Sequence, residues 1–90
     1  MSMDEQYAEM RRFRDTLSRF NLHLKDSMQE LKTQHEYVNP HWQDEMRRTY
    51  NASWEPLDQQ MKQYLEREGP AYLDFLNRKI RSLEGYLYGR

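Results

Sequence analysis

Cysteine is absent from this 90-residue sequence, and valine and isoleucine are almost absent. Without cysteine there is no disulfide framework, no thiolate nucleophile and no cysteine-based zinc site. Val38 and Ile80 are the only residues of their types, and because β-branched residues favour sheets, their scarcity argues against strands. No apolar run approaches the roughly 18–20 residues of a membrane-spanning helix, so we expect no membrane insertion. The first 14 residues lack an apolar core segment, and we expect no conventional signal peptide there.

No strong excess of charge of either sign is present, because 14 basic residues face 15 acidic ones and the formal net charge is −1. This balance predicts no general affinity for nucleic acid or for an anionic membrane. The three glycines form no phosphate-binding loop, and the three histidines do not have the spacing of metal ligands. No set of nucleophile and base can be read from the sequence. We therefore expect a non-enzymatic protein with no catalytic residues, no cofactor and no metal site.

What the sequence does contain favours helices, since leucine, methionine, glutamate, glutamine, lysine and arginine are frequent. We predict one domain with three helices, over residues of about 4–36, 40–68 and 70–88. Mean hydropathy is only −1.25, so few apolar residues are left to build a core. The sequence therefore predicts an all-α fold in which an antiparallel hairpin and a third helix complete a four-helix bundle by dimerising. A self-sufficient three-helix bundle is the alternative that the size of the chain leaves open.

Prolines and glycines mark the expected ends of the helices. Asn39 and Pro40 have the residue types of a helix cap and a first helical position, and so short a connection places the second helix antiparallel to the first. Pro56 predicts a kink, or a break of about one turn, in the second helix. Gly69 and Pro70 predict a stop, with Gly69 in a left-handed cap and a separate helix after it.

The first predicted helix carries an apolar residue every seven positions, which is typical of a helix that packs along its length against others. At 1.5 Å per residue this helix is roughly 50 Å long, more than the width of a compact domain of this size. The heptad seam and its neighbours give candidate interface residues: Met10, Phe13, Leu17, Phe20, Leu24 and Leu31. An apolar stripe in the third predicted helix is expected to recognise a partner, with its centre at Leu76, Ile80 and Leu83.

Aromatic residues follow the predicted turn at regular spacing. Trp42 lies near the middle of the chain, and Tyr50 and Trp54 follow it at +8 and +12. This pattern resembles the WXG family of small type VII secretion proteins, which are helical hairpins with Trp-x-Gly at the turn. The resemblance covers roughly residues 4–68, and Asp44 stands where the family has glycine.

The resemblance implies a secreted or adaptor protein of a bacterial type VII-like system that acts through dimerisation. Its partner would be itself or a paralogous helical hairpin, with a secretion ATPase or a secreted effector as further candidates. Such a protein would be cytoplasmic, or exported without a conventional signal peptide. Tyr64 and Glu68 fit the family's Tyr-x-x-x-Asp/Glu signal, a match expected about once by chance in this composition. The alternative is an ordinary aromatic core stripe in an intracellular helical adaptor or small chaperone unrelated to secretion.

Overall fold

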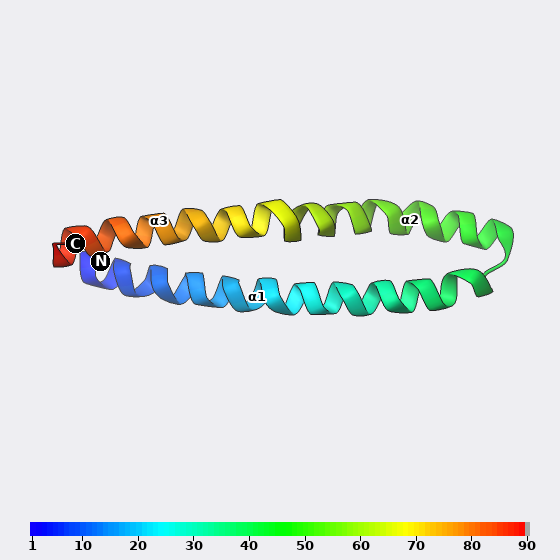
Figure 1. Cartoon of the computed structure of the whole chain (residues 1–90), viewed down its shortest axis with the longest axis horizontal. Helices are drawn as coiled ribbons and strands as arrows, with labels where there is room; N and C mark the ends of the chain where they lie inside the picture. Colours follow the sequence, from blue (N-terminus) through cyan, green and yellow to red (C-terminus); the bar gives the residue numbers. More distant parts are fainter. Residues whose placement is uncertain (90) are drawn as a thin grey trace.

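The computed structural model describes residues 1–89 and shows a long helical hairpin (Figure 1). The first arm is helix α1 (Met3–Val38), and the second arm runs through α2 (Asp44–Gln63), a π-helical turn η2 (Tyr64–Glu68) and α3 (Gly69–Tyr88). The two arms lie side by side and antiparallel, so the two ends of the chain meet at one end of the hairpin. The molecule is 64 Å long and only 21 Å and 16 Å across. The predicted all-α hairpin is therefore confirmed.

Helix α1 begins at a capping box. The backbone N–H of Glu5 donates a hydrogen bond of 3.2 Å to Ser2 Oγ, and the Ser2 hydroxyl donates in turn to the Glu5 carboxylate. Acidic side chains in this first turn also suit the positive end of the helix dipole. Because α1 contains no glycine or proline, it continues without interruption to Val38, slightly beyond its predicted end.

The connection is a 3-10 turn, η1 (Asn39–His41), rather than the start of the second helix. Arg47 reaches back from α2, and its guanidinium donates hydrogen bonds of 3.0 to 3.3 Å to three carbonyl oxygens, those of Asn39, Pro40 and Trp42. The Arg47 guanidinium thus holds the turn in place, and α2 begins only at Asp44. The predicted helix start at Pro40 is wrong for this reason.

The sequence predicts a kink at Pro56 or a break of about one turn, and of these two the break is wrong, because α2 continues through Pro56. Proline removes one N–H from the helix, which leaves the carbonyl of Ala52 without its usual donor. Ala52 and Pro56 are both exposed, and water can therefore hydrogen-bond this carbonyl.

The predicted stop at Gly69 and Pro70 is wrong, because the second arm continues from η2 directly into α3, whose range is close to that predicted for the third helix. Gly69 is right-handed helical, and its N–H donates to the carbonyl of Tyr64, five residues back. In a regular α-helix the ring of Pro70 would clash with the carbonyl four residues earlier, and a wider π turn relieves that crowding. The left-handed glycine is instead Gly89, which ends α3 with a φ of 69°.

The π turn also keeps the apolar stripe of the second arm in line. Leu65 and Leu73 are eight residues apart, which would separate them by about 80° around a regular α-helix. Because the π turn absorbs one extra residue, both side chains line the same cavity beside α1. The stripe of α2 therefore continues as the stripe of α3, which packs against α1.

The hydrophobic core is small. Among the residues that the structure describes, three apolar side chains are buried: Met28 is 4% exposed, Leu76 is 6% exposed and Ile80 is 2% exposed. Leu83 is half-buried beside them. Leu76 and Ile80 are used inside the hairpin, where α3 meets α1, and present no surface to a partner. The structure thus corrects the prediction that Leu76 and Ile80 form the centre of a recognition surface, and the predicted contribution of the half-buried Leu83 stays a prediction.

Candidate functional site

Polar side chains of α1 enter the line of contact between the two arms, which we call the seam, at intervals of seven residues. Four of them form hydrogen bonds to the second arm: Tyr7 to Glu84 (3.0 Å), Arg14 to Asn77 (3.0 Å), Asn21 to Tyr64 (2.6 Å) and His35 to Tyr50 (2.9 Å). Met28 occupies the remaining position of this series and is buried. A shift of one arm by a single turn would break all four bonds, so they fix the register of the hairpin.

These polar positions were not predicted from the sequence. The heptad spacing predicts Phe13 and Phe20 in the seam, whereas the structure places their neighbours Arg14 and Asn21 there. A polar residue on a helix is ordinarily expected to face water. Arg14 and Asn21 face the second arm because each has a hydrogen-bond partner there, 63 and 43 residues away in the sequence. Nothing local in the sequence indicates such distant partners.

Phe13 and Phe20 contribute instead to an exposed patch, which we call the aromatic face. The rings of Phe13 and Tyr72 meet edge-on with their centroids 6.2 Å apart, and Tyr72 lies 6.4 Å from Phe75. Phe20 likewise meets Tyr64 at 6.4 Å. Phe20 is 54% exposed and Phe75 is 45% exposed, so these rings are half in water. Clustered rings that both arms supply and neither arm covers are typical of a protein-binding surface.

The other interface candidates of α1 lie along the seam or beside it. Met10, Leu17 and Leu24 are half-buried between the arms, whereas Leu31 is 45% exposed. The first three therefore stabilise the hairpin itself, and of this group only Leu31 is open to a partner.

The aromatic residues after the turn form a stack at the closed end of the hairpin. Trp42 stacks on Tyr50 with a centroid distance of 4.7 Å, and Tyr50 lies 6.5 Å from Trp54. His35 joins the stack from α1, nearly parallel to Trp54 at 4.3 Å. The structure thus brings the three predicted aromatic residues together and uses them to tie the two arms. Asp44 is exposed in the first turn of α2 and takes no part in the stack.

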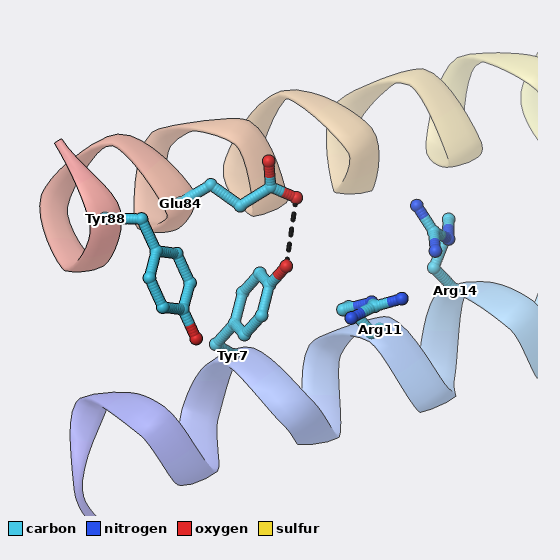
Figure 2. A pocket seen from close by; sticks show the side chains of 5 residues that line it. All are labelled: Tyr7, Arg11, Arg14, Glu84 and Tyr88. Carbon is cyan, nitrogen blue, oxygen red and sulfur yellow. Dashed lines mark hydrogen bonds between the residues drawn. The ribbon is translucent and has the colours of Figure 1, made fainter. Parts of the chain in front are cut away.

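A polar pocket of about 500 Å³ lies at the open end, where the two ends of the chain meet (Figure 2). Tyr7, Arg11 and Arg14 line it from α1, and Glu84 and Tyr88 line it from α3. The rings of Tyr7 and Tyr88 meet edge-on at 5.9 Å, and the Arg11 guanidinium lies 5.5 Å from the Tyr7 ring.

Most polar groups of this pocket are paired with other side chains of the protein. The Tyr7 hydroxyl donates to Glu84, and Arg14 bonds both Asn77 and Asp15. Partial desolvation, together with the hydrogen bond to the Glu84 carboxylate, raises the pKa of Tyr7 above the ordinary value of a tyrosine. The residues that line the pocket therefore connect α1 to α3 and hold the two ends of the chain together.

Within residues 1–89, no group of three or more histidine, cysteine or acidic side chains is placed to hold a metal ion. In the same part of the chain, no helix has both the length and the apolar character of a membrane span. Comparisons with protein-family models, curated proteins and solved structures find no match for this chain. The WXG resemblance therefore rests on the sequence pattern.

Proposed function

We propose that this chain is a non-enzymatic interaction protein that works as a pair of hairpins packed into a four-helix bundle. The observation that carries this proposal is the imbalance between a core of three buried apolar residues and an aromatic face whose rings are about half exposed. A hairpin is a single layer of helices, and domains bury their apolar faces by packing at least two layers together. A second hairpin, either another copy or a paralogue, supplies the missing layer.

The dimensions of the hairpin suit this arrangement. Its broad side measures 64 by 21 Å, which gives a larger outline than the roughly 800 Å² per partner of a standard interface. Charges beside the aromatic face also indicate an orientation. Glu9, which also pairs with Arg12, precedes Phe13 by one turn on α1, and the Lys79 ammonium lies 5.5 Å from the Phe75 ring on α3. When α1 of one hairpin lies over α3 of the other, Glu9 of each hairpin faces Lys79 of the other, and the open ends of the two hairpins lie together. We therefore favour this parallel pair.

The light-scattering mass of an aromatic-face variant tests this interface. We expect Phe20→Ser combined with Tyr72→Ser to halve the mass of the assembly while the helical circular dichroism remains. The matched control is Leu22→Ser, because Leu22 is 61% exposed but lies on the other flank of α1, and it should keep the mass of the unmodified chain. An aromatic-face variant with unchanged mass would show that another surface forms the interface.

We extend the proposal to a secreted or adaptor role in a type VII-like system, on the strength of the WXG-like spacing of Trp42, Tyr50 and Trp54. The stack that these residues form beside the turn supports it. Export is tested by comparing culture supernatant with cytosol in cells that have or lack the membrane-bound ATPase of such a system. ATPase-dependent appearance in the supernatant supports secretion. A chain retained in the cytosol of both strains, without binding to the secretion ATPase, favours an intracellular helical adaptor or small chaperone.

A further inference from the structure

A second surface lies on the opposite flank of the seam from the aromatic face. Phe20 precedes the seam residue Asn21 by one position, whereas Lys25 follows it by four, and these positions fall on opposite sides of a packed helix. On the Lys25 side, two cavities of about 380 and 250 Å³ lie between α1 and the second arm. They share Lys25 and Leu65 among their lining residues, so they form one groove, which we call the lysine groove.

The lysine groove has apolar side chains along its length. Met28, only 4% exposed, lines the larger cavity, and Leu65 lines both cavities. Leu22 and Leu73 line the smaller cavity, and Leu22 is 61% exposed. An apolar floor of this kind suits the apolar stripe of an amphipathic helix.

Positive charge is concentrated in the larger cavity, and the carboxylates of Glu36 and Asp58 line an adjoining cavity of about 350 Å³ that shares Lys32 and Lys62 with it. Lys25, Lys32 and Lys62 line the larger cavity, and Glu66 is the one carboxylate that lines it with them. Lys32 pairs across the arms with Asp58 at 3.6 Å. Within residues 1–89, neither Lys25 nor Lys62 takes part in an ion pair. Two ammonium groups beside an apolar floor are thus open to carboxylates from outside the hairpin.

We infer that the lysine groove binds an acidic amphipathic helix of a partner protein. Lys25 comes from α1 and Lys62 from α2, and both line the larger cavity. Acidic residues on the two flanks of the apolar stripe of a docked helix would meet these two ammonium groups. The apolar stripe of the docked helix then covers Leu22, Leu65 and Leu73. This inference uses residues outside the aromatic face and does not depend on the proposed dimer.

Two synthetic helical peptides with the same leucine stripe test the inference by fluorescence anisotropy. One peptide carries glutamates on both flanks of the stripe, and the other carries lysines there. We expect the acidic peptide to bind at least ten-fold more tightly, with an affinity that falls as salt is raised. Lys25→Glu combined with Lys62→Glu should reverse the preference, and Lys25→Gln with Lys62→Gln should remove most of it. The control Arg48→Glu changes a charge at an exposed position of α2 that lines neither cavity, and it should leave the preference intact.

Equal binding of the two peptides, or a preference that survives both groove variants, would overturn the inference. A groove variant that changes the mass of the chain itself while peptide binding stays the same would show that a second copy occupies the groove, which also overturns it. A monomeric chain that still selects the acidic peptide would contradict the proposed dimer and leave the groove assignment standing.

Discussion

The hydroxyl of Tyr64 donates a hydrogen bond of 2.6 Å to Oδ1 of Asn21, which joins the middle of α1 to the π turn of the second arm. Gly69 lies against the same pair. A Cβ atom at residue 69 would stand 3.1 Å from Asn21 Nδ2 and 3.1 Å from the carbonyl oxygen of Tyr64. The approach of the two arms at this point therefore depends on a residue without a side chain.

Gly69→Ala should destabilise the hairpin, although the same change inside most helices is stabilising by about 0.5–1 kcal/mol. Overpacking costs roughly 1–3 kcal/mol, and one of the two crowded atoms belongs to the backbone, which yields little. We expect a net loss of about 1 kcal/mol in the free energy of unfolding, measured by urea denaturation. Ser82→Ala, at an exposed position of α3, is the control and should change stability by less than about 0.5 kcal/mol. A gain in stability from Gly69→Ala would contradict the close approach.

A double-mutant cycle on Asn21→Ala and Tyr64→Phe measures the seam hydrogen bond itself. Each single change leaves one partner without its bond, so the two effects should not add. We expect a coupling free energy of about 0.5–1.5 kcal/mol in urea unfolding. Effects that add within about 0.3 kcal/mol would mean that this pair does not help to set the register.

Trp54→Ala should loosen the closed end of the hairpin, because Trp54 stacks on both His35 and Tyr50. Replacing a fully packed tryptophan costs roughly 3–5 kcal/mol, and for this half-buried ring we expect about 2–3 kcal/mol in thermal or urea unfolding. The control is Met46→Ala in the same helix, since Met46 is 58% exposed. Equal stability of the two variants would show that the stack contributes little.

The raised pKa of Tyr7 predicts that the free energy of unfolding falls at alkaline pH. Its raised pKa means that the folded chain holds the phenolic proton more tightly than the unfolded chain does. The stabilisation is thus fully present below the ordinary tyrosine pKa of about 10 and is lost as pH rises from there through the folded value. We expect the free energy of unfolding of the unmodified chain to fall more steeply above about pH 10 than that of Tyr7→Phe. Parallel pH profiles of the unmodified chain and Tyr7→Phe would show that Tyr7 does not cause the loss of stability.

The sequence predicts the features that depend on neighbouring residues. Ser2 and Glu5 have the Ser-x-x-Glu spacing of a capping box, and they form one because both partners lie within one turn. The all-α hairpin follows from composition and from the short connection at Asn39. Trp42 and Tyr50 also meet, because both lie at the closed end of the hairpin and are only eight residues apart in the sequence.

What the sequence could not predict depends on contacts between distant residues. A glycine followed by proline usually ends a helix. Here a π turn accommodates Pro70, and the absence of a side chain at Gly69 allows α1 to lie close to the second arm. From the sequence alone, Arg14 is expected to lie at the surface. Its partner Asn77 comes next to it only when the hairpin has formed. Arg47 gives no local signal of its role, because the carbonyl oxygens that it bonds become available only when the turn has formed.

Sedimentation equilibrium of the unmodified chain at micromolar concentrations tests the central claim most directly, namely that this hairpin completes its core with a second one. The account predicts a concentration-dependent mass that rises from the 11.2 kDa of one chain to twice that value. A single species of 11.2 kDa at all concentrations, which still unfolds cooperatively, would show that the small core is sufficient and would contradict the account.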